Sequence, residues 1–198
     1  MLYVGVDPGG TIGLVVYCPT QRRVLMAGEY TDPTDALRAL RLGGLAEAVQ
    51  ADGVRLAIEG VGLYRTDTTR PGGNVVGESV FATARQVGWF SAMFAMPPSG
   101  HHVMGNSIVR NLLVGHLPAK MRGERVVNQW LRDQHGGEDS TRKALEPVEA
   151  TWRKDGSPWR KAAPGRAQGA LVGVVGHSWN ALACAVAAAK RDGVWEAK

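Results

Sequence analysis

Three short apolar runs near the amino terminus constrain the fold of this chain most strongly. They cover Leu2 to Val6, Thr11 to Tyr17 and Arg23 to Tyr30. Two turn segments separate them, Asp7-Pro8-Gly9-Gly10 and Pro19-Thr20-Gln21. Runs of this length between turn residues predict three sequential strands in a meander. We therefore expect a β-sheet to begin at the amino terminus.

Helix and strand signals alternate along the rest of the chain. Asp32-Pro33-Thr34-Asp35 predicts the start of an amphipathic helix that contains Leu37, Leu40, Leu45 and Val49 and is interrupted near Gly43-Gly44. The later elements expected are a strand at Arg55–Ile58, a helix at Gly77–Trp89, a strand at Ser91–Met96, helices at Asn106–Val114 and Arg122–Leu131, and a closely packed helix of small residues within Val172–Lys190. Strands followed by covering helices indicate an α/β fold.

The size and charge of the chain bound its class. A length of 198 residues suits one domain, 1–198, in which the Gly-, Pro- and charge-rich segment 133–169 is expected to be a functional or mobile insertion. Residues 1–60 hold five basic and seven acidic residues, whereas the remainder holds 18 basic and 11 acidic ones. A basic second part favours a polyanionic partner such as nucleic acid.

Several features indicate the compartment. Apolar windows are too short or too polar for a membrane span, and no secretory leader is recognisable. Cys18 and Cys184 have no disulfide or metal spacing, so we expect reduced thiols in the core. We therefore expect a cytoplasmic protein that does not associate with a membrane.

Two acidic residues end predicted strands. Asp7 closes the first run and Glu59 closes a later one, so both carboxylates are expected at one edge of the sheet, where they would suit a divalent metal. His177 and Asn180 are three residues apart at the start of the last helix and share a face. Taken singly, each residue also fits a turn or a helix cap. As a set they are a candidate metal site.

These motifs together resemble the RuvC family of Holliday-junction resolvases, in a bacteriophage-type form. The resemblance rests on Val4-Gly5-Val6-Asp7-Pro8-Gly9 with the following strand Gly13–Val16, on Ala57-Ile58-Glu59, and on His177-x-x-Asn180-Ala181-Leu182-Ala183. Weaker matches are Ala84-Arg85, Val109-Arg110-x-x-Leu113-Val114-Gly115 and Lys120. The resemblance covers most of 1–131 and 171–190. It implies a ribonuclease H-like fold, with a mixed central sheet and helices on both faces.

The resemblance also implies an activity. Family members hydrolyse a phosphodiester of four-way or other branched DNA with two Mg²⁺ or Mn²⁺ ions, as homodimers in the cytoplasm of bacteria or phage-infected hosts. Asp7 would bridge both ions, and Glu59, His177 and Asn180 would complete the shells. Arg110 and Lys120 would neutralise the scissile phosphate or fix the strand.

Asn180 departs from the family pattern, which has Asp at this position. An amide keeps an oxygen ligand but removes a full negative charge, so metal binding should be weaker. The residue is either a natural variation or an engineered inactivating substitution.

Further DNA contacts are expected in two loops. Tyr64-Arg65 lies beyond Glu59, where family members place an aromatic side chain against unstacked bases. The insertion repeats an aromatic residue with two cations, Trp152-Arg153-Lys154 and Trp159-Arg160-Lys161, which could stack on bases and contact phosphates. Surface or anchoring roles explain these residues equally well.

Other interpretations stay open. Asp7-Pro8-Gly9-Gly10-Thr11 also resembles the phosphate motif of actin-like sugar kinases, although 198 residues are too few for those enzymes. A non-catalytic junction-binding protein is an alternative that Asn180 allows, and a nuclease for flaps and other branched DNA is not distinguished from a strict junction resolvase. Phe81, Val87, Trp89 and Phe90 could form a dimer seam or belong to the core. His101, His102, His116 and His135 are expected at surface or loop positions without chemistry.

Overall fold

The computed structural model describes residues 1–42, 53–60, 78–93, 101–141 and 169–196. Its centre is a five-stranded sheet of order β3-β2-β1-β4-β5. The strands are β1 (Leu2–Asp7), β2 (Ile12–Cys18), β3 (Arg23–Tyr30), β4 (Val54–Gly60) and β5 (His101–Gly105). The first three strands pair antiparallel, while β4 pairs parallel with β1 and β5 parallel with β4. The predicted meander and the mixed sheet are therefore confirmed.

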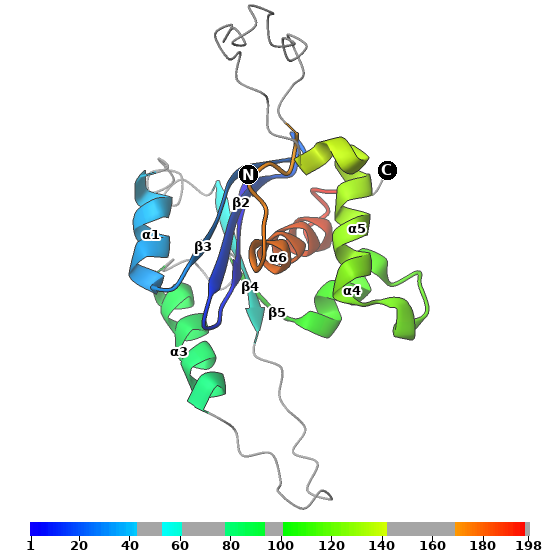
Figure 1. Cartoon of the computed structure of the whole chain (residues 1–198). Coiled ribbons are helices and arrows are strands. Elements are labelled where there is room, and N and C mark those ends of the chain that lie inside the picture. The colour runs from blue at the N-terminus through cyan, green and yellow to red at the C-terminus, as the bar shows by residue number, and fades with distance from the viewer. Residues whose placement is uncertain (43–52, 61–77, 94–100, 142–168, 197–198) are drawn as a thin grey trace, which may run out of the picture.

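Helices cover both faces of the sheet (Figure 1). On one face α6 (Ser178–Arg191) packs against the strands, with α4 (Asn106–Val114) and α5 (Glu124–Gln134) outside it. The other face carries α1 (Pro33–Leu42) and α3 (Glu78–Met93). Short 3-10 helices lie at Ala119–Met121 (η2) and Gly137–Thr141 (η3). This arrangement is the α/β fold expected from the sequence.

Alternation along β1 and β4 decides which residues face α6. Val4 and Leu56 belong to the core under α1 and α3, while Tyr3 and Ala57 belong to the core around α6. Since side chains alternate between the two faces of a strand, Asp7 lies on the α6 side together with Tyr3. By the same rule Glu59 lies there with Ala57. Both acids therefore lie on the α6 side where the two parallel strands end.

Small residues let α6 lie close to the sheet. A side chain at Gly5 would overlap the backbone carbonyl of Ala181 on α6. The nine residues from Ala181 to Ala189 are all buried, and six of them are Ala. Close approach of the helix axis brings its amino-terminal residues within hydrogen-bond reach of the strand ends. The packing of α6 thus sets the geometry of the candidate site.

One expected element is corrected by the structure, and another is confirmed. The strand expected at Ser91–Met96 is wrong, because α3 continues to Met93 and the edge strand β5 is His101–Gly105. A short apolar run does not distinguish strand from helix by periodicity. The last helix begins at Ser178, with His177 as its N-cap, as expected; Gly173 and Gly176 adopt positive φ and turn the chain just before it. Leu45 and Val49 lie outside the described residues.

The histidine expectation was also wrong at three positions. His101 and His102 lie in β5. His135 is buried, and its Nε2 lies 2.9 Å from the Tyr17 hydroxyl while its Nδ1 lies 2.6 Å from the Leu131 carbonyl oxygen. Tyr17 is 118 positions away in sequence, so local spacing gave no signal of this contact. The expectation for Cys18 and Cys184 is confirmed, since both are buried free thiols.

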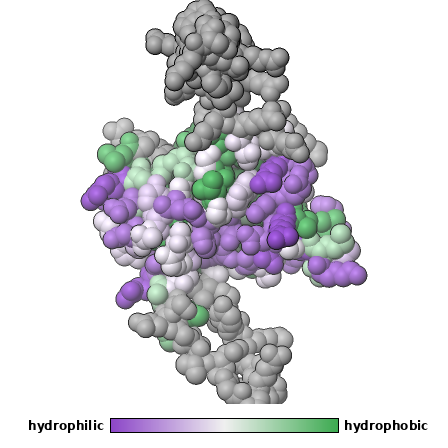
Figure 2. Space-filling model, viewed as in Figure 1, coloured by the Kyte–Doolittle hydropathy of each residue, from purple (hydrophilic) through white to green (hydrophobic). Residues whose placement is uncertain are grey.

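The surface of the described segments bears on membrane and partner contacts. No described helix has the length and apolar character required to cross a membrane. Phe90 is buried, with Val87 and Trp89 packed near it, whereas Phe81 is 65% exposed. Core packing therefore explains three of the four residues expected at a dimer seam, and Phe81 is the exception. On the face in Figure 2, green hydrophobic residues form separate patches among purple hydrophilic ones.

Candidate active site

Asp7 lies at the end of β1 and is held by the first turn of α6. Its Oδ2 accepts hydrogen bonds from His177 Nδ1 at 3.0 Å and Asn180 Nδ2 at 3.2 Å. A carboxylate acceptor requires the proton of His177 on Nδ1. The side chain of Asp7 is nearly buried, whereas that of His177 is about half exposed. One carboxylate oxygen is thus fixed from two sides.

Glu59 lies beside Asp7 at the end of β4. Its Oε1 accepts a hydrogen bond from Asn106 Nδ2 at 2.8 Å, at the start of α4. Burial raises the pKa of Glu59 to about 7, and the negative charge of Asp7 adds to this shift, while Asn106 and Arg110 oppose it. A carboxylate whose pKa is raised by burial and by a neighbouring acid marks a place where a cation is favoured.

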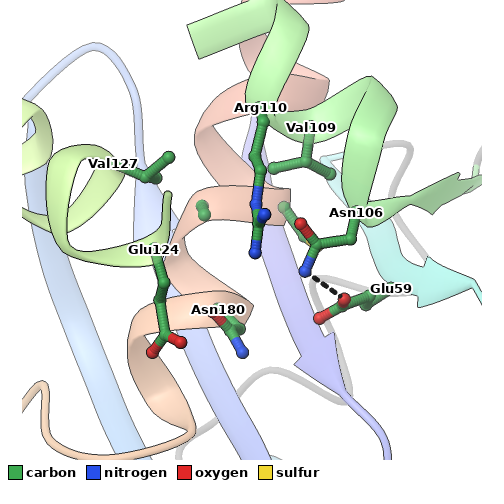
Figure 3. Close-up of a pocket in the computed structure, with 9 residues that line it drawn as sticks. Glu59, Asn106, Val109, Arg110, Glu124, Val127 and Asn180 are labelled. Atoms are coloured by element: carbon green, nitrogen blue, oxygen red, sulfur yellow. Dashed lines mark hydrogen bonds between the residues drawn. The ribbon is translucent and has the colours of Figure 1, made fainter. Parts of the chain in front are cut away.

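An open pocket of about 280 Å³ lies between α4, α5, α6 and the end of β4. Figure 3 shows its polar side chains pointing inward, with the Arg110 guanidinium between Glu59 and Glu124 in this view. The lining residues are Glu59, Asn106, Val109, Arg110, Glu124, Val127, Asn180, Ala183 and Cys184. The pocket therefore combines carboxylates, amides and a cation above an apolar floor.

Glu29 on β3 holds the amino-terminal end of α6. Its Oε1 accepts a hydrogen bond from the backbone N–H of His177 at 2.6 Å. Side chains at Gly13 and Gly176 would overlap the His177 carbonyl and the Glu29 carboxylate, respectively. Gly176 also adopts φ +44°, a conformation that favours glycine. These close contacts determine where His177 meets Asp7.

The donor set fits a hard divalent cation. Asp7 and Glu59 offer carboxylate oxygens and His177 an imidazole. A half-turn of the Asn180 amide would exchange its nitrogen for its oxygen at the same place. Within the described segments, no three His, Cys, Asp or Glu side chains are grouped closely enough to hold an ion by themselves. Water or substrate oxygens would thus have to complete a shell, as is usual for Mg²⁺.

The predicted site residues have different outcomes. The structure brings Asp7, Glu59, His177 and Asn180 together, and Arg110 lines the adjoining pocket. Lys120 is exposed on η2 and is not among the pocket-lining residues, so its role stays a prediction. The predicted DNA contacts in the two loops lie outside the described residues: Tyr64, Arg65, Trp152, Arg153, Lys154, Trp159, Arg160 and Lys161.

The turn after Asp7 does not resemble an open phosphate loop. The Gln86 side chain on α3 accepts a hydrogen bond from Gly9 N at 2.9 Å and donates one to Gly9 O at 3.1 Å. The Gly9 amide is therefore occupied by the protein itself. This observation disfavours the sugar-kinase interpretation, in which backbone amides of the turn would bind nucleotide phosphate.

Sequence reasoning missed three polar residues of the site: Glu29, Asn106 and Glu124. Asn106 directly follows β5, which was itself not predicted. Glu124 follows Gly123 in the first turn of α5, a position that ordinarily indicates only a favourable helix terminus. For Glu29 no sequence signal was available, because its contact is with a residue 148 positions away.

The sheet order, the flanking helices and the acids at the strand ends define a ribonuclease H-like fold. Among solved structures, the chain is similar to Thermus thermophilus RuvC in complex with a Holliday junction substrate, with a TM-score of 0.53 and 16% identity over 100% of this chain and 99% of the other. A second structure of Thermus thermophilus RuvC matches with a TM-score of 0.50 and 18% identity over the full length of both chains.

These likenesses confirm the RuvC-like fold. No protein-family model matches the sequence, and no curated protein does either.

Proposed function

We propose that this chain is a metal-dependent, structure-selective endonuclease that cleaves Holliday junctions or related branched DNA. The observation that carries the proposal is the contact of Asp7 with His177 and Asn180, next to Glu59, on a RuvC-like fold. One of the similar structures is a complex with a Holliday junction, which supports branched DNA as the substrate class.

Asp7, Glu59, His177 and Asn180 would hold Mg²⁺ or Mn²⁺, two ions per site. When bound, such ions activate a water molecule and stabilise the leaving oxygen of a phosphodiester. The Asp7 carboxylate is already oriented by His177, and that of Glu59 by Asn106. This order reduces the reorganisation required on binding.

Arg110 would contact the DNA backbone in this proposal. Its guanidinium lines the pocket beside Glu59, close enough to lower the pKa of that carboxyl. An Arg side chain can bind a phosphate through two parallel hydrogen bonds. A phosphate at the strand ends would therefore meet one cation from the protein. Symmetric cleavage of a four-way junction would further require two copies of the site, and we propose a homodimer for this reason.

Asn180 favours a second candidate, a junction-binding protein without nuclease activity. The amide in place of a carboxylate leaves the first turn of α6 with no acidic ligand. Such a protein would bind branched DNA through the same surface, while the metal shell stayed too weak for hydrolysis.

Cleavage of defined substrates distinguishes these candidates. Labelled four-way junction and linear duplex with the same arm sequences are incubated with the full chain in Mg²⁺, Mn²⁺ or chelator, and the products are separated on a denaturing gel. We expect metal-dependent cuts near the branch point and none in linear duplex. Tight junction binding without cuts would support the second candidate. Equal cutting of both substrates would overturn structure selectivity.

A further inference from the structure

The pocket contains a carboxylate that the family pattern does not explain. Glu124 lines the same pocket as Asn180 but comes from a different helix, α5. Figure 3 shows both side chains directed into this pocket. The chain therefore lacks a negative charge on α6 and carries one on α5 at the same cavity.

The position of Glu124 is fixed by the packing of its helix. Val127, one turn later, lies in the pocket floor and belongs with Leu131 to the core around α6. The preceding loop is braced by Arg122, which donates to the carbonyl oxygens of Leu117 and Gly115 at 2.7 Å each and to Asn111 Oδ1. Glu124 is thus presented from a rigid helix start rather than from a free loop.

Glu124 forms no hydrogen bond or ion pair with another described residue, and its side chain is exposed to solvent. The pocket it lines already holds the Glu59 carboxylate and the Asn180 amide. A hard cation binds carboxylate oxygens directly or through its retained water molecules. A cation held at the end of β4 would therefore have Glu124 as a further anionic group on the α5 side.

We propose that Glu124 supplies the negative charge that Asn180 lacks, so that the divalent-cation site of this chain is completed from α5 instead of α6. The proposal deepens the proposed function and rests on it for the presence of a metal. It assigns the negative charge that is absent at position 180 to one residue of α5. It also predicts that Glu124 and position 180 compensate for each other.

The test measures metal binding separately from cleavage. Binding of Mn²⁺ by the full chain without DNA is followed by electron paramagnetic resonance of the free ion. The proteins compared are the native chain, Glu124→Gln, Asn180→Asp and the double variant. Asp133→Asn serves as the matched control, because Asp133 is also an exposed acid on α5 and contacts Gln129 away from the pocket.

We expect Glu124→Gln to weaken Mn²⁺ binding by about tenfold or more, the size typical of losing a group that supports a metal site. Asn180→Asp should strengthen binding, and Glu124→Gln should cost less in that background. Asp133→Asn should leave binding unchanged. Thermal melting of each variant confirms that it is folded.

Three results would overturn the proposal: unchanged Mn²⁺ binding in Glu124→Gln, equal losses in both backgrounds, or no Mn²⁺ binding by any form. Junction cleavage by the same proteins separates this outcome from the proposed function. Weakened Mn²⁺ binding without any cleavage by native chain or Asn180→Asp would support the Glu124 assignment and refute the nuclease. Junction cleavage that is unchanged in Glu124→Gln would support the nuclease and refute the Glu124 assignment.

Discussion

The two ends of α6 each bring an aspartate together with a histidine, but in opposite electrostatic settings. At the amino-terminal end, Asp7 contacts His177 and lies beside the acidic Glu59. At the other end, Asp192 contacts His102 at 3.0 Å and also meets further donors. The Asp7–His177 pair therefore lies beside a second acid. In the other pair, the Asp192 carboxylate accepts hydrogen bonds from several donors.

The Asp192 cluster is closed by the starts of three strands. The Tyr3 hydroxyl on β1 donates to Asp192 Oδ2 at 2.6 Å, and Arg55 Nη1 on β4 lies 3.4 Å from the same oxygen. Hydrogen bonds from Tyr3 and His102 lower the pKa of Asp192 against the effect of its burial. This cluster fastens the end of α6 to the sheet and leaves no charge for a ligand.

The difference between the two ends of α6 distinguishes acids that stabilise the fold from acids at a binding site. Burial and the Asp7 charge raise the pKa of Glu59 to about 7, whereas donors lower that of Asp192. A carboxylate whose pKa is raised by burial and a neighbouring acid is expected where a cation or substrate binds. A carboxylate that accepts hydrogen bonds from several donors stabilises the fold instead. Five predictions test this contrast.

The largest effect is expected at the acidic end. Asp7→Asn should lower metal-dependent junction cleavage by at least about 100-fold, as expected for loss of an electrostatic catalytic group. Junction affinity should change by less than about tenfold, because Asp7 is not a phosphate contact. Single-turnover cleavage and gel-shift titration measure the two effects. Asp35→Asn, on the opposite face of the sheet, is the control, and equal cleavage by Asp7→Asn would remove Asp7 from the site.

The next effect is expected at the saturated end. Asp192→Asn should lower the free energy of unfolding by about 2 kcal/mol, because Tyr3, His102 and Arg55 lose a charged acceptor. Urea denaturation measures this loss. Cleavage by the folded variant should stay within about twofold of the native rate, since the site at the other helix end is untouched.

The pH dependence of this stabilisation has a definite sign. The folded-state pKa of Asp192 is lowered, so its contribution is present above the unfolded value of about 3.9 and is lost as pH falls through the folded value. The stability difference between native chain and Asp192→Asn should therefore shrink as pH falls below about 4. A difference that grows toward acid pH would contradict the role assigned to the cluster.

A smaller effect is expected at Glu29. Glu29→Ala removes the acceptor of the His177 N–H and should reduce cleavage about tenfold through misplacement of the first turn of α6. Glu29→Gln keeps an acceptor oxygen and should restore most of the rate. Rate measurements at saturating junction distinguish these variants. The positioning role would be refuted if Gln and Ala behaved alike.

The smallest effect has the opposite sign to that at Asp192. In chelator, Glu59→Gln should leave the free energy of unfolding unchanged or raise it by up to about 1 kcal/mol, because it removes a charge that repels Asp7. Its Oε1 can still accept from Asn106. Urea denaturation in chelator checks this, and a loss like that of Asp192→Asn would end the distinction between the two regions.

Much of the fold and the principal acids were predictable from local pattern. Short apolar runs between turn residues predicted β1 to β3, and the ends of two apolar runs predicted the strand-end positions of Asp7 and Glu59. His177 and Asn180 were predicted from a helix start. In these cases the necessary information lies within a few residues of the site residue itself.

The remaining features depend on contacts between distant segments. The edge strand β5 is stabilised by pairing with β4, and its sequence His101-His102-Val103 resembles a loop as much as a strand. Glu29 and Glu124 acquire roles only when β3 and α5 are placed against α6. No local pattern distinguishes them from ordinary exposed acids.

The most direct test of the central claim is the location of bound metal. Crystals of the full chain are soaked in Mn²⁺, and anomalous scattering is measured. We expect anomalous peaks beside Asp7 and Glu59 and none at Asp192. A peak at Asp192, or full Mn²⁺ binding in solution with no peak at the strand ends, would contradict it.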